Sequence, residues 1–270
     1  MNEKINPEHS SLATLVDAFQ AEGRYTFDRA EAMAALHVSG PKLKKAARRL
    51  AAKKRIAVPK RGFYVIVPLE YRAAGSPPPS WFIDDLMRHL GKPYYVGVLS
   101  AAGIHGAAHQ QPQEFQVVTE LASRPIMAGR SRIRFLGKRH HDRTLISEVK
   151  TETGSMKVST PEATALDLLR YAPSSGGIGN VATVLAELAE RIEPGRLAKA
   201  ARLEGKLAHA QRLGHILDLV GAGDRSSALA ELIDEKKPRR VPLRPGRPVK
   251  GCVVDRRWRI IINERIEVDV

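Results

Sequence analysis

The chain has 270 residues, which is long enough for one large domain or for two or three smaller ones. Its formal net charge of +15 favours a polyanionic partner such as DNA, RNA or an anionic membrane. The single cysteine, Cys252, excludes an internal disulfide and suits a reducing compartment. Residues 1–10 do not resemble a signal peptide, and no run of about 18 apolar residues indicates a membrane span. We therefore expect a cytoplasmic protein.

The first part of the chain predicts three helices. Apolar residues at helical spacing indicate a first helix that ends at Gly23. Thr26 is the expected N-cap of a second helix over 27–36. Ser39 is the expected N-cap of a third helix over 41–54, which has a proline in its first turn. The short interval between the second and third helices is typical of a helix-turn-helix.

A hairpin follows the third helix. Strands are predicted at 55–59 and 63–68, with Lys60 and Arg61 at the tip. This order of elements predicts a winged helix-turn-helix, in which the hairpin is the wing. Ten basic residues and no acidic residue lie between Lys42 and Arg61. A structural helix usually mixes acids with bases, because like charges four residues apart repel.

The third helix has the pattern of a DNA recognition helix. Leu43, Ala47 and Leu50 share one face, and the opposite face is basic. Arginine can donate two hydrogen bonds to guanine, so Arg48 is the expected base reader and Lys45 the second candidate. The full set of candidate DNA-binding residues is Ser39, Lys42, Lys44, Lys45, Arg48, Arg49, Lys60 and Arg61.

The rest of the chain predicts a mixture of strands and helices. Residues 76–80, Ser-Pro-Pro-Pro-Ser, indicate a rigid linker between units that fold independently. Ser159 or Thr160 is the expected N-cap of a helix that starts at Pro161, and Ser159 and Glu162 match a capping box. The expected helices are 81–90, 100–108, 180–191, 194–203, 206–219 and 226–234, and the expected strands are 93–99, 114–119, 132–136, 145–149 and 257–268.

A second basic stretch lies near the C-terminus, in a proline-rich segment that is expected to run extended over the surface. It either binds nucleic acid or a partner, or is merely a solvated strap across the C-terminal part. Its candidate residues are Lys236, Lys237, Arg239, Arg240, Arg244, Arg247 and Lys250.

No catalytic residue, cofactor or metal site is predicted. Glu148 and Lys150 match part of a metal-dependent nuclease motif, but the nearest upstream acid, Asp142, is too close to come from a separate strand. We expect an ordinary edge strand there. His105 and His109 have ligand spacing without an evident third ligand, so a packing or capping role is favoured. A metal-dependent nuclease or another nucleic-acid enzyme, targeted by a winged helix, remains the alternative function.

Three stretches in order resemble the AbiEi family, the antitoxins of type IV toxin–antitoxin systems, which are associated with abortive infection. They are Tyr94–Ala102 followed by His105-Gly106, Val158–Leu168, and Trp258–Asn263. The resemblance implies an α+β protein whose N-terminal domain binds operator DNA and represses its own operon. It also implies a C-terminal domain that counteracts a nucleotidyltransferase-type toxin without forming a stable complex.

The predicted organisation is therefore a winged helix-turn-helix over residues 1–75, a linker over 76–80 and an α+β antitoxin domain over 81–270. A sub-boundary is expected near 173–180, after which the chain becomes largely helical.

Overall fold

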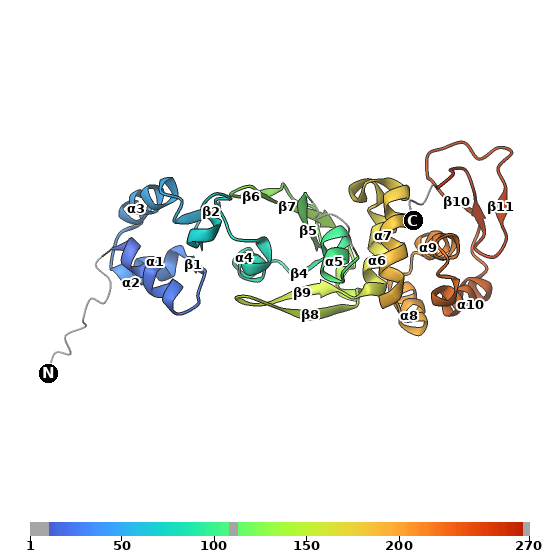
Figure 1. Cartoon of the computed structure of the whole chain (residues 1–270), viewed down its shortest axis with the longest axis horizontal. Coiled ribbons are helices and arrows are strands. Elements are labelled where there is room, and N and C mark those ends of the chain that lie inside the picture. The colour runs from blue at the N-terminus through green and yellow to red at the C-terminus, as the bar shows by residue number, and fades with distance from the viewer. Residues whose placement is uncertain (1–10, 108–112, 267–270) are drawn as a thin grey trace.

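The computed structural model describes residues 11–107 and 113–266. Its parts lie in a row along an elongated molecule: a small N-terminal unit, a central sheet and a group of C-terminal helices (Figure 1). The described apolar residues form three buried clusters. One lies within the N-terminal unit, one links the N-terminal hairpin to the sheet, and one lies between the sheet and the C-terminal helices. The protein is α+β with a helical C-terminal region, as expected.

The N-terminal unit contains α1 (Leu12–Ala21), α2 (Arg29–Leu36), α3 (Gly40–Ala52), β1 (Thr26–Asp28), β2 (Ile56–Lys60) and β3 (Phe63–Ile66). The three helices and the β2–β3 hairpin follow the predicted order, and β3 lies between β1 and β2. The predicted cap of α2 is wrong. Asp28 is the N-cap and accepts from the Glu31 N–H at 2.8 Å. Thr26 instead begins β1, and its hydroxyl donates to Asp85 at 2.6 Å. A carboxylate is favoured at this end of a helix because it also complements the helix dipole.

The proline-rich segment is packed against the protein and is not an exposed spacer. Short elements flank it: η1 (Leu69–Tyr71) precedes it, η2 (Pro79–Trp81) overlaps its end, and α4 (Ile83–His89) follows. Pro77 and Pro79 are buried. The Trp81 ring lies edge-on to Tyr25, at 4.9 Å between centroids, and to Tyr71, at 5.3 Å. Contacts therefore cross the predicted linker, whereas independent folding of the parts that it joins stays a prediction.

The centre of the molecule is a mixed six-stranded sheet. Its spatial order is β6 (Ile126–Ala128), β7 (Ser131–Gly137), β5 (Glu114–Thr119), β4 (Tyr94–Val96), β9 (Gly154–Ser159) and β8 (Ile146–Thr151). The pairs β4–β9 and β5–β7 are parallel, and the others are antiparallel. β6 and β9 were not predicted from the sequence. α5 (Val98–Ile104) leaves β4 through Gly97, where a Cβ would come within 2.9 Å of Val118 Cγ2.

Five longer helices build the C-terminal part, close to the predicted bounds: α6 (Pro161–Arg170), α7 (Gly177–Leu188), α8 (Pro194–Glu204), α9 (Leu207–Leu219) and α10 (Ser227–Lys236). Single 3-10 turns occur at η3 (His141–Arg143), η4 (Ala172–Ser175), η5 (Ala189–Arg191) and η6 (Gly223–Ser226). Of the two expected N-caps of α6, Thr160 is confirmed. The predicted capping box of Ser159 and Glu162 does not form, because the Ser159 hydroxyl bonds to the Thr164 hydroxyl at 2.7 Å.

The long C-terminal strand predicted over 257–268 is wrong within the described residues. The chain there forms only short strands: β10 (Val241–Pro242), β11 (Val254–Asp255) and β12 (Ile260–Ile261). The turn between β11 and β12 buries Trp258 completely, and the indole N–H donates to Asp218 at 2.7 Å. Its ring lies over α9 at Gly214, where a Cβ would come within 2.2 Å of the ring. Burying a large aromatic ring therefore takes precedence over continuous strand pairing in this segment.

Among the described helices, none has both the length and the apolar character needed to cross a membrane.

Candidate nucleic-acid interface

α3 combines a buried apolar face with a basic exposed face. Leu43, Ala47 and Leu50 are buried against the rest of the N-terminal unit. The predicted contact residues of this helix are all exposed: Lys42, Lys44, Lys45, Arg48 and Arg49. Ser39 occupies the predicted N-cap position and is exposed, but its hydroxyl caps no backbone N–H.

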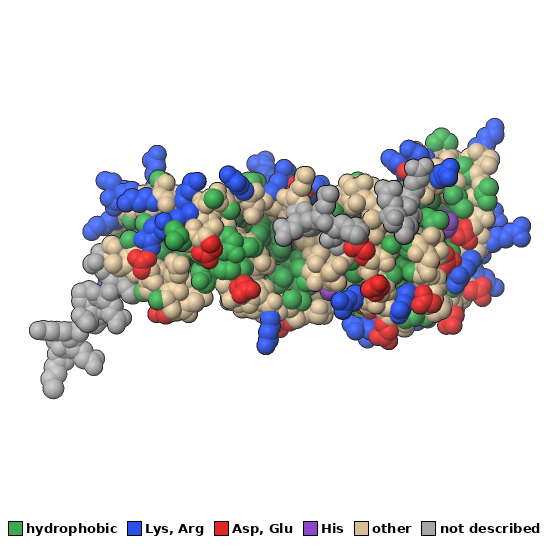
Figure 2. Space-filling view, viewed as in Figure 1, with side chains coloured by type: hydrophobic (Ala, Val, Ile, Leu, Met, Phe, Trp, Pro, Cys, Tyr) green, Lys and Arg blue, Asp and Glu red, His purple; other side chains and the backbone are tan. Residues whose placement is uncertain are grey.

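The cations of α3 have no acidic partners among the described residues. The nearby Arg55 forms an ion pair with Asp17, but no ion pair joins any lysine or arginine of α3 to a described carboxylate. Figure 2 shows Lys and Arg side chains gathered at the end of the molecule where α3 lies. Unpaired cations on one helix face keep their donors free for an anionic partner.

The hairpin adds two more exposed cations to the N-terminal unit. Lys60 and Arg61 are exposed at the turn, which Gly62 completes with a φ of 82°. His89 of α4 donates from Nε2 to the Arg61 carbonyl at 3.4 Å, and its ring lies 5.3 Å from the Phe63 ring. The backbone of the hairpin is therefore held against α4, and the side chains of Lys60 and Arg61 are exposed to solvent.

The second basic stretch lies at the opposite end of the molecule from α3 (Figure 1). It is partly neutralised. Arg244 and Arg247 lie 2.7 and 3.8 Å from Glu264 oxygens, and Lys236 lies 2.7 Å from Glu235. Three further predicted residues of this stretch are exposed without an ion pair to a described acid: Lys237, Arg239 and Arg240. The structure thus separates the two predicted basic regions and does not combine them into one site.

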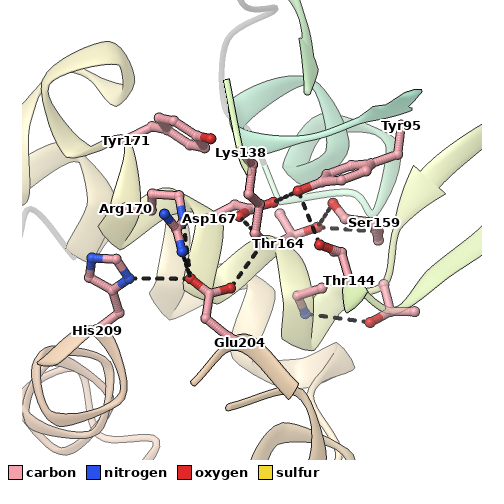
Figure 3. A network of polar contacts seen from close by, with 12 residues as sticks. Tyr95, Lys138, Thr144, Ser159, Thr164, Asp167, Arg170, Tyr171, Glu204 and His209 are labelled. Carbon is pink, nitrogen blue, oxygen red and sulfur yellow. Dashed lines mark hydrogen bonds and ion pairs between the residues drawn. The ribbon is translucent and has the colours of Figure 1, made fainter. Parts of the chain in front are cut away.

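A buried polar network joins the sheet to the C-terminal helices, and sequence reasoning missed it (Figure 3). Lys138, directly after β7, places its Nζ 2.8 Å from Asp167 of α6 and 3.0 Å from Glu204 of α8. Asp167 also accepts from the Tyr95 hydroxyl at 2.8 Å, and Glu204 accepts from Arg170. An aspartate inside the apolar run 165–169 was the one sequence signal that pointed to it.

The surroundings shift the pKa values of Asp167 and Glu204 in opposite directions. Burial raises the pKa of Asp167, and this effect outweighs the opposing charge of Lys138. Burial alone would also raise the pKa of Glu204, but a hydrogen bond with His209 and the charges of Lys138 and Arg170 hold that pKa well below its usual range. Glu204 is therefore the acid that this network stabilises in its ionised form.

The residues that resembled a nuclease motif or a metal site do not form such a site among the described residues. Glu148 and Lys150 are on β8, an edge strand as expected, and Glu148 is hydrogen-bonded to Ser155. Asp142 lies in the η3 turn. The described residues contain no group of three or more His, Cys, Asp or Glu side chains placed to hold a metal ion. His105 ends α5 and contacts the Ser159 carbonyl at 2.7 Å, which confirms its packing role, and His109 lies outside the described residues.

Two comparisons with known proteins found a similarity, one to a family model and one to a solved structure. Residues 95–219 match the family model of the AbiEi antitoxin C-terminal domain. No curated protein sequence matches the chain. The chain is similar in fold to the crystal structure of the RV2827C protein from Mycobacterium tuberculosis, with a TM-score of 0.66 and 16% identity over 92% of this chain and 89% of that one. The matched region contains most of the sheet and α5 to α9, and this part of the chain is identified as an AbiEi antitoxin C-terminal domain.

Proposed function

We propose that this antitoxin binds double-stranded operator DNA through its N-terminal unit and represses its own operon in the cytoplasm. The observation that carries the proposal is the face of α3, where five exposed cations have no described acidic partner. In this proposal the N-terminal unit is a winged helix-turn-helix, α3 enters the major groove, and Lys60 and Arg61 contact phosphates.

The second part of the proposal concerns the AbiEi domain. We propose that it counteracts a nucleotidyltransferase-type toxin, that the two proteins do not form a stable complex, and that the antitoxin itself has no enzymatic activity. The support is the family match over residues 95–219. The exposed cations of α3 lie outside the matched residues, so DNA binding and toxin antagonism are assigned to different parts of the chain.

A gel-shift titration on the promoter fragment of the operon tests DNA binding. The double variant Lys45→Ala, Arg48→Ala of the full chain should bind the operator more weakly, because a base contact and a flanking cation are lost. Loss of the base contact alone should cost about 1–3 kcal/mol of binding free energy. The loss should be larger for the operator than for unrelated DNA.

Lys199→Ala, Arg202→Ala is the matched control, because it removes the same charge from exposed positions of α8. The control variant should bind like the unchanged protein. Operator affinity that is unchanged in the α3 variant, or equally reduced in both variants, would remove α3 from the interface.

A further inference from the structure

A pocket of about 300 Å³ opens onto the buried network. One wall is the segment between β7 and β8, and the other is formed by α6, α8 and the start of α9. The volume is at the lower end of the range of roughly 300–1,000 Å³ that is typical of small-molecule sites. Neither α3 nor the hairpin contributes to it, so the proposed DNA-binding face and this pocket are separate.

The pocket is strongly cationic. Lys138 and Arg170 lie at its inner side, and Arg139, Arg143 and Lys206 lie at exposed positions around it. The only carboxylate in its lining is Glu204, and Lys138 and Arg170 already neutralise that group. No ion pair joins the three exposed cations to a described acid, so an anionic ligand is the natural complement.

Some N–H donors at the inner side of the pocket have no hydrogen-bond partner among the described residues. Of the three N–H donors of the Lys138 ammonium, two are directed to Asp167 and Glu204. Arg170 uses Nε and Nη2 on Glu204, at 3.0 and 2.5 Å, while its Nη1 has no described partner. The buried ion pairs hold both side chains in place, so they can donate to a ligand without first being ordered.

Both walls of the pocket contribute apolar side chains. Leu145 comes from the segment between β7 and β8, and Ala163, Leu166 and Ala200 come from α6 and α8. Inorganic phosphate alone would leave these side chains uncovered, whereas a ligand with both a ring and phosphate groups would use the apolar and cationic parts together. We propose that the pocket binds a nucleotide, with its phosphates on Arg139 and Arg143 and its sugar or base against Leu145 and Ala200.

Calorimetric titration of the full chain with ATP, GTP, pyrophosphate and inorganic phosphate at physiological salt tests this site. A nucleoside triphosphate should bind in a saturable way, about fivefold or more tightly than pyrophosphate, because only the nucleotide covers the apolar side chains of the pocket. Arg139→Ala, Arg143→Ala should weaken nucleotide binding about tenfold or more. Both substitutions are at exposed positions, so the variant is expected to fold.

Arg124→Ala, Arg130→Ala is the matched control, since it removes two exposed arginines outside the pocket. Nucleotide affinity in this control should stay within about twofold of the unchanged protein. The absence of saturable binding at about 1 mM, or an equal loss in both variants, would overturn the proposal. Pyrophosphate that binds as tightly as nucleotide would overturn the nucleotide class. None of these outcomes depends on operator binding by α3.

Discussion

Lys138 shows how a single residue can connect two parts of the protein. It follows strand β7 of the sheet, yet its ammonium group lies between carboxylates of two different helices, Asp167 and Glu204. The side chain is only 5% exposed, so its charge is stabilised by these partners and very little by water. A buried charge that loses its partner costs several kcal/mol, which is more than the modest net gain of the intact pair.

Replacement of Lys138 by methionine should therefore be strongly destabilising. Lys138→Met keeps the length and apolar stem of the side chain but leaves Asp167 and Glu204 without their shared cation. The free energy of unfolding, measured by urea titration at neutral pH, should fall by about 3–5 kcal/mol. The control is Arg139→Met at the next position, which is exposed and should change stability by no more than about 0.5 kcal/mol. Equal effects in the two variants would mean that the network contributes no specific stabilisation.

The hairpin is the element that should control the electrostatic part of DNA binding. Lys60 and Arg61 are exposed at its tip, where they can reach phosphates but few base edges. If the helix and hairpin together neutralise about six phosphates, the logarithm of the binding constant should fall against the logarithm of salt concentration with a slope of roughly −5.

Lys60→Ala, Arg61→Ala should make that slope shallower by about 2 and weaken operator and unrelated DNA alike. Fluorescence anisotropy at a series of salt concentrations measures the slope. The double variant of Lys199 and Arg202 in α8 should leave it unchanged. A slope near zero for the unchanged protein would mean that phosphate contacts do not drive binding.

Elements with a regular local pattern could be predicted from the sequence. α6 to α10 have apolar residues at helical spacing and helix-terminating residues at their ends, and their predicted bounds differ from the structure by only a few residues. β1 and β6 have three residues each and pair with strands elsewhere in the chain, so their residues carry too little periodicity to be recognised.

The basic face of α3 and the buried network also differ in how far the sequence predicts them. The basic face of α3 lies within one helix and could be predicted from spacing alone. The buried network could not, because Lys138 and Asp167 are 29 positions apart and Tyr95 and Asp167 are 72 positions apart. Only the packing of the sheet against α6 and α8 brings these side chains together, and the sequence contains no spacing rule for such a contact.

At the scale of the whole molecule, the proposed DNA-binding unit is fixed against the sheet. One buried cluster includes Phe63 and Val65 of the hairpin, Leu86 of α4 and Val117 of the sheet. The Thr26 hydroxyl and the Trp81 ring add polar and aromatic contacts across the same boundary. Cutting the chain at the proline-rich segment would expose this apolar surface, so separate fragments could fail for reasons unrelated to function.

The two proposed functions are better separated in the full chain. Lys45→Ala, Arg48→Ala changes only exposed positions of α3 and should leave the AbiEi domain over residues 95–219 intact. With the toxin expressed from an unrelated inducible promoter, repression of the native operon no longer affects toxin level. The variant should then restore growth as fully as the unchanged antitoxin, at equal protein levels on an immunoblot, although it fails to shift operator DNA. Growth that recovers only with variants that still bind the operator would show that protection depends on DNA binding by α3, and the assignment of toxin antagonism to the AbiEi domain would be wrong.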